Sequence, residues 1–417
     1  LEIIDCFATL AMTSPMVFFY SLIIRRSLIS RSNVMSKEIQ AVLMLVGMII
    51  GVGMFAIPFS FYAAGFWLGV FELCVLAFVV LAIHLCYGAI VSHTKEQHRL
   101  PGYARIYLGD RAAVLAYAST FFGIAGTLLA YMLLGGVFLH GLFAPFISAS
   151  SPIFWSIIFV IVGACITQFP FKKETLINGI LTTFLIAFIG VLIFILLPRV
   201  NIEYLGGFHG VNAFAPYGVI LFALSGATVI PDVMSFLKGK PERARRVIMA
   251  GSLIPAVIYF FFAFVVVGVS GAGVSPDAIA GLMPVAGRMI VALGNIIGLL
   301  AVITSYIALN SSFQAFLILD ARVPRTLAWA GGSFLPLFLF ILGFQNFISV
   351  ISVVGATTVA IDGGIIIAAY HMILHRRERG ITIADTIRFG LMYAIMIAGI
   401  GYELYRFISL YIRPVAL

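Results

Sequence analysis

The chain has 417 residues, of which 62% are hydrophobic and 10% are charged, and its mean hydropathy is +1.15. A soluble domain carries about 25% charged residues, so this composition excludes a soluble enzyme and indicates a protein that crosses the membrane many times. The net charge of +9 does not predict nucleic-acid binding, because the basic residues lie between apolar segments, where they indicate membrane topology.

Residues 1–36 precede the first regular span. Residues 3–24 are apolar enough to cross a membrane, although they include Asp5 and Pro15. Two interpretations stay open: a helical or disordered N-terminal extension, or a translated upstream region with Met35 as the natural start. We favour the second, because the predicted architecture is complete without this region.

Eleven later segments are apolar enough to cross the bilayer, which requires about 20 residues each. We therefore predict an all-α polytopic membrane protein. The predicted spans are residues 39–65, 66–91, 112–143, 152–171, 176–198, 212–238, 246–271, 288–320, 326–343, 345–374 and 383–410.

The basic residues agree with this division of the chain. If the residues before the first span are cytoplasmic, all but four of the 25 lysines and arginines lie on the cytoplasmic side. The exceptions are Arg199, Arg288, Arg406 and Arg413. Because cytoplasmic loops are enriched in basic residues, we expect a multi-pass protein of the inner membrane with a cytoplasmic N-terminus.

The first span contains Gly51-Val52-Gly53, followed by Pro58. Inside a helix, Gly costs about 1 kcal/mol relative to Ala and Pro about 3 kcal/mol. Backbone groups released by a break have no water to bind in the bilayer, so a break is tolerated only in a protein interior or beside a polar cavity. Packing alone can also explain one glycine-rich kink.

A similar break is predicted five spans later, in the sixth span. Gly53 and Gly226 each stand five residues before a proline, and each proline follows an isoleucine. Because five is odd, the two spans cross the membrane in opposite directions, as in an inverted repeat. The predicted regions are an N-terminal extension (1–36), a first repeat (37–200), a second repeat (201–378), and the last span with the C-terminus (379–417).

Two such breaks suit a zwitterionic ligand. The N-terminal end of a half-helix offers free N–H groups and about half a positive charge to a carboxylate. The C-terminal end offers free carbonyls to an ammonium group or a small cation. An amino acid therefore fits these groups without any charged side chain.

The motif from Gly47 to Pro58, followed by Tyr62-Ala-Ala-Gly65, resembles the first helix of permeases of the amino acid–polyamine–organocation superfamily. The nearest branches are the amino acid/auxin permeases and the bacterial aromatic amino acid permeases. The sixth span and its basic loop resemble theirs too. This resemblance implies the leucine-transporter fold, a five-plus-five inverted repeat with broken helices one and six.

The resemblance also implies a substrate site. The substrate carboxylate would bind the main-chain N–H groups of Gly51, Val52 and Gly53, with Met54 beside them. Tyr131 in the third span and residues of the sixth span would line the side-chain pocket. The sixth-span candidates are Phe222, Ala223, Leu224, Ser225 and Gly226.

Coupling to a cation is expected, with Na⁺ and H⁺ both open and no other cofactor. A possible Na⁺ site combines Gly47, Ile50, Ala301, Thr304 and Ser305, where the resemblance pairs span-eight hydroxyls with span-one carbonyls. Oxygen ligands suit a hard cation, but each hydroxyl can instead bond to its own helix. Asp362 in span ten is the candidate proton carrier, or else a carboxyl bonded to the Thr357–Thr358 turn or to another helix.

These features predict a cation-coupled amino acid permease that imports neutral or aromatic amino acids by alternating access. A sensor or an exchanger of the same fold is the alternative. No phosphate-binding loop is present, which excludes ATP as the driving force, and neither a selectivity loop nor a catalytic pair supports a channel or an enzyme. The expected partners are an amino acid substrate and the lipid bilayer, with no nucleic acid, and the expected state is a monomer.

Overall fold

The computed structural model describes residues 37–147, 150–168, 174–208, 210–237, 241–319, 322–375 and 382–411. Helices and turns make up these ranges, and no strand occurs in them. The expectations for residues 1–36 fall outside them. So do the topology predictions for Lys172, Lys173, Lys238, Lys240, Arg376, Arg377, Arg379 and Arg413.

Every predicted span contains a helix or a group of helices. In chain order these are α3 (Lys37–Ile49) with η1 (Val52–Ala56) and α4 (Ile57–Ala64), α5 (Phe66–His93), α7 (Asp110–Phe143), α8 (Pro152–Thr167), α9 (Glu174–Leu196), α10 (Ala215–Leu224) with η5 (Ala227–Val229) and α11 (Ile230–Phe236), α12 (Pro241–Ser270), α13 (Met283–Leu319), α14 (Arg325–Ile341), α15 (Phe347–Val354) with η8 (Gly355–Val359) and α16 (Ala360–His375), and α17 (Ile383–Tyr411). Short 3₁₀ turns are η2 (Leu197–Arg199), η3 (Ile202–Leu205), η4 (Gly210–Asn212), η6 (Gly271–Gly273) and η7 (Ala280–Leu282).

Among the described residues, eight helical stretches are long and apolar enough to cross a membrane. A ninth is the first span, whose halves meet at a bend of 52°. The helices α8 and α14 are apolar but have only 16 and 17 residues. The all-helical membrane architecture is therefore confirmed, while the count of eleven spans stays a prediction.

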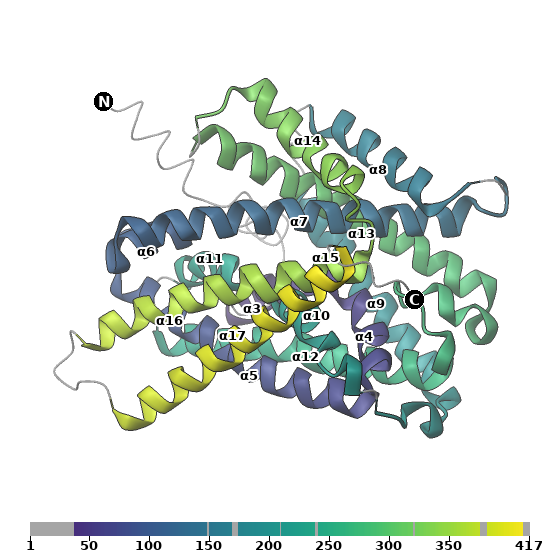
Figure 1. Ribbon diagram of the computed structural model, residues 1–417, viewed down its shortest axis with the longest axis horizontal. Coiled ribbons are helices and arrows are strands. Elements are labelled where there is room, and N and C mark those ends of the chain that lie inside the picture. The colour runs from purple at the N-terminus through teal and green to yellow at the C-terminus, as the bar shows by residue number, and fades with distance from the viewer. Residues whose placement is uncertain are drawn as a thin grey trace, which may run out of the picture.

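The helices pack in two main groups (Figure 1). One group joins α3, α4, α5, α10, α11 and α12, which are the first, second, sixth and seventh predicted spans. The other joins α7, α8, α9, α13 and α14, and Figure 1 shows α8 and α14 together on one side of the long helix α7. The tenth predicted span connects the groups, because α15 and η8 contact both α10 and α7, and α16 contacts both α5 and α7.

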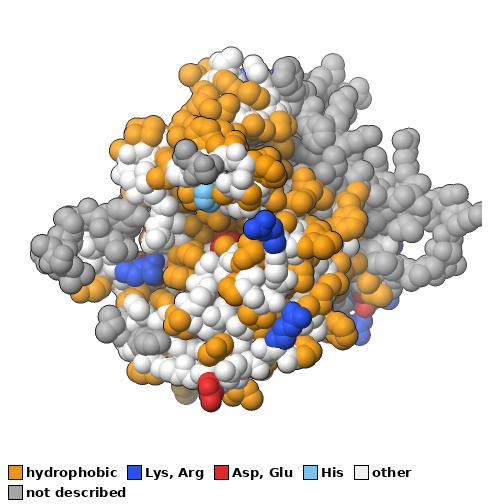
Figure 2. All heavy atoms as spheres, turned by 90° about the vertical axis from the view of Figure 1, so that its right-hand side faces the viewer, with side chains coloured by type: hydrophobic (Ala, Val, Ile, Leu, Met, Phe, Trp, Pro, Cys, Tyr) orange, Lys and Arg blue, Asp and Glu red, His pale blue; other side chains and the backbone are white. Residues whose placement is uncertain are grey.

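The outer surface is apolar, as a protein in lipid requires. Figure 2 shows many apolar and few charged side chains on one face. Phe71, Phe122 and Phe194 are 64%, 66% and 80% exposed. These helices are apolar on both their packed and outer faces, which distinguishes them from the amphipathic helices of soluble proteins.

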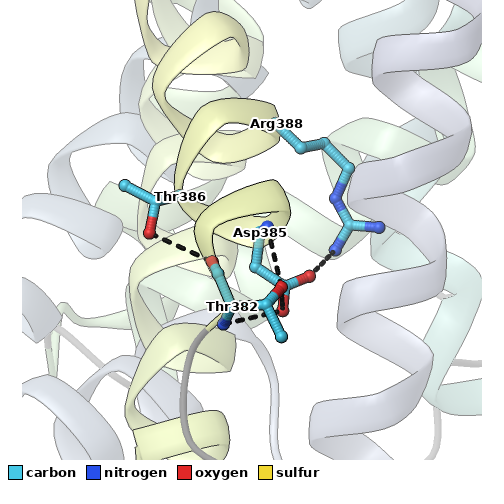
Figure 3. A network of polar contacts seen from close by, with 4 residues as sticks. All are labelled: Thr382, Asp385, Thr386 and Arg388. Carbon is cyan, nitrogen blue, oxygen red and sulfur yellow. Dashed lines mark hydrogen bonds and ion pairs between the residues drawn. The ribbon is translucent and has the colours of Figure 1, made fainter.

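Capping fixes the start of the last helix, α17 (Figure 3). The Thr382 hydroxyl accepts a hydrogen bond from the Asp385 N–H at 3.1 Å, and the Asp385 carboxylate accepts one from the Thr382 N–H at 3.3 Å. This reciprocal pair satisfies N–H groups that have no partner within the helix. Arg388 also pairs with Asp385 at 3.3 Å.

Two features of the fold were not expected. A short helix, α6 (Leu100–Leu108), precedes α7, and an ion pair of 3.0 Å between Arg105 and Asp110 links them. The π-helical turn η8 interrupts the tenth span, for which no break was predicted. Such turns leave backbone groups out of the regular helical pattern and often mark functional regions.

Candidate substrate site at two helix breaks

The break in the first span lies at Gly51. The N–H of Ile50 still donates to the carbonyl of Val46 at 2.8 Å, so the helix persists to that point. Gly51 is extended (φ −152°, ψ −150°), and η1 begins after it. Within the described part of the chain, no acceptor is hydrogen-bonded to the N–H groups of Gly51, Val52 and Gly53. Three donors therefore stand free at the start of a half-helix.

The break in the sixth span has the same construction. The helix α10 ends at Leu224, Ser225 is extended (φ −62°, ψ 117°), and η5 begins after Gly226. In both spans the proline follows the break and lies in the first turn of the second helix. Proline is tolerated there because its missing N–H would have no partner in any case.

The two breaks touch because Gly53 has no side chain. A Cβ atom on Gly53 would lie 2.8 Å from the Cα of Ala223 and 2.9 Å from Cδ1 of Phe222. On the other side, a Cβ on Gly226 would lie 2.6 Å from Cγ1 of Ile49. Each break thus packs against the neighbouring one, and the glycines permit the close approach.

A small cavity of about 10 Å³ adjoins the first break. Its walls come from the break and from α7, α9 and α13. The lining residues are Ile50, Gly51, Val52, Phe55, Tyr131, Thr182, Leu185, Ala301, Val302 and Ser305. This volume holds about one water molecule or one small cation, whereas a pocket for a small organic ligand measures about 300–1,000 Å³.

The structure gathers some of the predicted substrate-site residues and separates others. Gly51, Val52 and Tyr131 line the cavity. The other predicted residues lie outside its lining: Gly53, Met54, Phe222, Ala223, Leu224, Ser225 and Gly226. Of these, Gly53, Phe222 and Ala223 form the contact between the two breaks.

Three of the five predicted cation ligands, Ile50, Ala301 and Ser305, line the same cavity. The Ser305 hydroxyl is hydrogen-bonded to the hydroxyl of Tyr131. Thr304 instead donates within its own helix, to the carbonyls of Leu300 at 2.9 Å and Ala301 at 3.2 Å. A hydroxyl that donates in this way keeps lone pairs for a cation, but Thr304 does not border the cavity.

The sequence reasoning missed Thr182 on α9. Its side chain lines the cavity opposite the break, and a Cβ on Gly47 would lie 4.0 Å from its methyl group. Thr182 thus connects Gly47, one of the two predicted ligands outside the cavity lining, to the cavity wall. The available signal was a pair of hydroxyl residues, Thr182-Thr183, inside an apolar span.

Asp362 lies in the first turn of α16, three residues after the π-helical turn η8 ends. One carboxyl oxygen is buried and has no hydrogen-bond partner among the described residues, and the carboxyl group is hydrogen-bonded to Ser119 on α7. The Ser119 hydroxyl also lies 3.2 Å from the carbonyl of Thr358. The hydroxyls of Thr357 and Thr358 bond within their own helix, so the partner of Asp362 is on another helix.

A model of the tryptophan/tyrosine permease family matches residues 35–361. The chain belongs to this family. The match covers both helix breaks and ends one residue before Asp362. No curated protein matches this permease by sequence.

Three solved structures share the fold of this permease. Mhp1, a nucleobase-cation-symport-1 family transporter in a closed conformation with bromovinylhydantoin bound, has a TM-score of 0.61 at 14% identity, covering 88% of this chain and 92% of its own. A manganese transporter of Eremococcus coleocola has a TM-score of 0.58 at 13% identity, covering 88% and 87%. MhsT in complex with L-phenylalanine has a TM-score of 0.53 at 18% identity, covering 91% and 99%.

The family and the fold agree with the sequence analysis. The permease is a multi-pass membrane protein with the leucine-transporter fold, and it is a secondary transporter of amino acid-type substrates, not an enzyme. These findings do not identify a branch of the amino acid–polyamine–organocation superfamily, so the predicted branch stays a prediction.

Proposed function

We propose that this protein imports aromatic amino acids, tryptophan or tyrosine, across the inner membrane by alternating access, as a member of the bacterial aromatic amino acid permease branch. The observation that carries the proposal is the pair of interlocked helix breaks within the region that matches the tryptophan/tyrosine permease family. The L-phenylalanine complex of MhsT, a protein of the same fold, supports a substrate with an aromatic side chain.

In this proposal the substrate carboxylate binds the free N–H groups of Gly51, Val52 and Gly53. Donors at a helix N-terminus favour an anion through their hydrogen bonds and the helix dipole. Tyr131 lines the same cavity as this break, which supports a contact between its side chain and the substrate. Phe222 flanks Gly53 and supplies an aromatic surface from the sixth span.

Loading requires the cavity to open. About 10 Å³ is far too small for tryptophan, which needs a pocket of several hundred Å³. The two packing groups provide the moving parts: α3, α4, α5, α10, α11 and α12 would rock as one body against α7, α8, α9, α13 and α14. The cavity lies between these groups, since its walls come from both.

The proposed coupling ion is a proton carried by Asp362. A carboxyl group inside a membrane protein is costly when charged, so its retention favours a functional role. Its buried, unpartnered oxygen and its bond to Ser119 are compatible with a neutral carboxylic acid. Sodium is the second candidate, because the cavity beside Ile50, Ala301 and Ser305 has the volume of one ion.

Uptake into proteoliposomes tests the function directly. We expect purified protein, which we propose to be a monomer, to accumulate labelled L-tryptophan or L-tyrosine when an inwardly directed proton gradient is imposed. Binding of L-tryptophan without any flux would instead indicate a sensor, and flux only against internal amino acid would indicate an exchanger. Neither binding nor uptake of any aromatic amino acid would refute the proposed substrate.

The sodium candidate has its own test in the double variant Thr304→Ala/Ser305→Ala. If sodium binds in the cavity, removal of the Ser305 hydroxyl at its wall, together with the neighbouring Thr304 hydroxyl, should abolish any sodium stimulation of L-tryptophan uptake. The measurement is the initial uptake rate as sodium replaces choline at constant pH. Sodium stimulation that survives in the double variant would exclude this site. Ser311→Ala, on the same helix outside the cavity, is the control.

A further inference from the structure

The hydroxyl of Tyr259 lies between the two helix breaks. It is 2.8 Å from the carbonyl oxygen of Ile49 and 3.0 Å from that of Ala223. Tyr259 belongs to α12 and its side chain is completely buried (0% exposed). One side chain from a third helix therefore contacts both interrupted spans at the level where they break.

Both carbonyls belong to the ends of first half-helices. Ile49 is the last residue of α3, and Ala223 lies in the last turn of α10. In a continuous helix these carbonyls would accept from the N–H groups four residues on, which belong to Gly53 and Ala227. The breaks remove those partners, so two carbonyls with the partial negative charge of helix C-termini are left close together.

Such a pair of buried carbonyls needs a hydrogen-bond donor or a cation between them. In transporters with broken helices, half-helix C-terminal ends and unwound carbonyls commonly coordinate a cation. Here the O–H of Tyr259 occupies the position between the two oxygens. Its single proton can be shared between two acceptors in a three-centre hydrogen bond.

We propose that the Tyr259 hydroxyl takes the place of a cation between the two breaks and that it is a positioning residue for substrate binding. The part that concerns substrate depends on the proposed function. The two hydrogen bonds of the Tyr259 hydroxyl hold α3 against α10 beside the contact of Gly53 with Ala223. They thereby fix the direction of the free N–H groups of Gly51, Val52 and Gly53.

The test uses Tyr259→Phe, which removes the oxygen and keeps the ring. The two carbonyls then lack a donor, and the vacated space can admit a cation. In choline chloride we expect a lower melting temperature than wild type and L-tryptophan affinity reduced about 10-fold or more. Added NaCl or LiCl should restore the melting temperature and the affinity of the variant, and this effect should saturate with salt concentration. Both quantities should increase more in the variant than in wild type in the same salts.

Tyr393→Phe is the matched control. The Tyr393 hydroxyl also donates to a backbone carbonyl, that of Gly364 at 3.1 Å, but no break lies there. We expect this variant to show the same response to cation identity as wild type and L-tryptophan affinity within about twofold of it. All proteins are purified in NaCl and transferred to choline, so that a folded sample of Tyr259→Phe is available at the start.

The melting temperatures need no substrate, so they separate this inference from the proposed function. If wild type fails to bind L-tryptophan, the proposed function fails, and the recovery of the melting temperature of Tyr259→Phe in NaCl or LiCl still decides the role of the hydroxyl. Stability and affinity equal to wild type in choline would overturn the inference. If NaCl and LiCl restore the melting temperature and affinity of Tyr259→Phe no better than choline chloride does, the hydroxyl does not take the place of a cation. Failure to obtain folded Tyr259→Phe in NaCl, when Tyr393→Phe folds normally, would overturn that role too.

Discussion

Gly53→Val should reduce L-tryptophan uptake by at least about 100-fold while the protein still inserts into the membrane. The first added carbon alone would lie 2.8 Å from the Cα of Ala223, a backbone atom that cannot rotate away. The two breaks must therefore separate, which displaces the N–H groups of Gly51, Val52 and Gly53. A misplacement of about 1 Å at a reacting or binding group can cost about 100-fold in rate.

Gly190→Val provides the control for this substitution. Gly190 lies within the membrane-spanning helix α9, and a Cβ atom there meets no atom within 4 Å. The measurements are initial uptake, L-tryptophan binding, and the yield of monodisperse protein from the membrane fraction. Wild-type uptake by Gly53→Val would show that the contact between the breaks is not needed, whereas loss of membrane-inserted protein would show that the contact serves folding.

The breaks could be predicted from sequence because their causes are local. Glycine and proline disfavour a helix interior wherever they occur, and the prolines five residues after Gly53 and Gly226 indicate where the next helix starts. The N–H groups of Gly51, Val52 and Gly53 are free in the structure, while their role in substrate binding, which the resemblance implied, stays a prediction. Repetition of this local signal in an oppositely oriented span predicts the inverted repeat, and the family resemblance implies the leucine-transporter fold.

The partners of these local features could not be predicted, because they come from distant helices. Nothing near Asp362 in sequence points to Ser119, and nothing near Ile49 points to Tyr259. Thr182 is a partial exception: the pair Thr182-Thr183 marks a polar position in an apolar span, but nothing in the sequence shows which helices face it. Side-chain packing between helices decides these contacts, and lipid-facing and protein-facing positions are equally apolar in this chain.

The irregular turn η8 could not be predicted from the sequence for a different reason. The segment Gly355–Val359 contains no proline, and its two threonines are compatible with an ordinary helix. The close packing of α10 accounts for its single glycine: a Cβ on Gly355 would collide with the carbonyl oxygen of Gly218. The irregular turn therefore accompanies a tertiary contact with the sixth span, and a single span examined alone carries no sign of it.

Asp362→Asn should abolish proton-driven accumulation of L-tryptophan, lowering it by at least about 50-fold at a fixed inward proton gradient, while exchange of internal for external L-tryptophan continues. The amide is nearly isosteric and can still bond to Ser119, but it cannot take up and release a proton. A substitution that only damaged packing would reduce accumulation and exchange together. The ratio of the two rates therefore separates coupling from structure.

Ser119 gives this prediction a second test, because its hydroxyl has one proton. When that proton is donated to the carbonyl of Thr358, a bond to Asp362 requires the carboxyl group to be the donor, and hence protonated. When Asp362 is ionised, Ser119 must turn its proton to the carboxylate and leave the Thr358 carbonyl. The hydroxyl thus connects the charge of Asp362 to the irregular turn η8, which packs against α10.

Ser119→Ala should keep uptake but make its rate less dependent on pH than in wild type. Asp277→Asn, which alters a buried carboxyl group that caps η7, should leave accumulation, exchange and their pH dependence unchanged. Accumulation by Asp362→Asn at the wild-type level would assign proton coupling to another group.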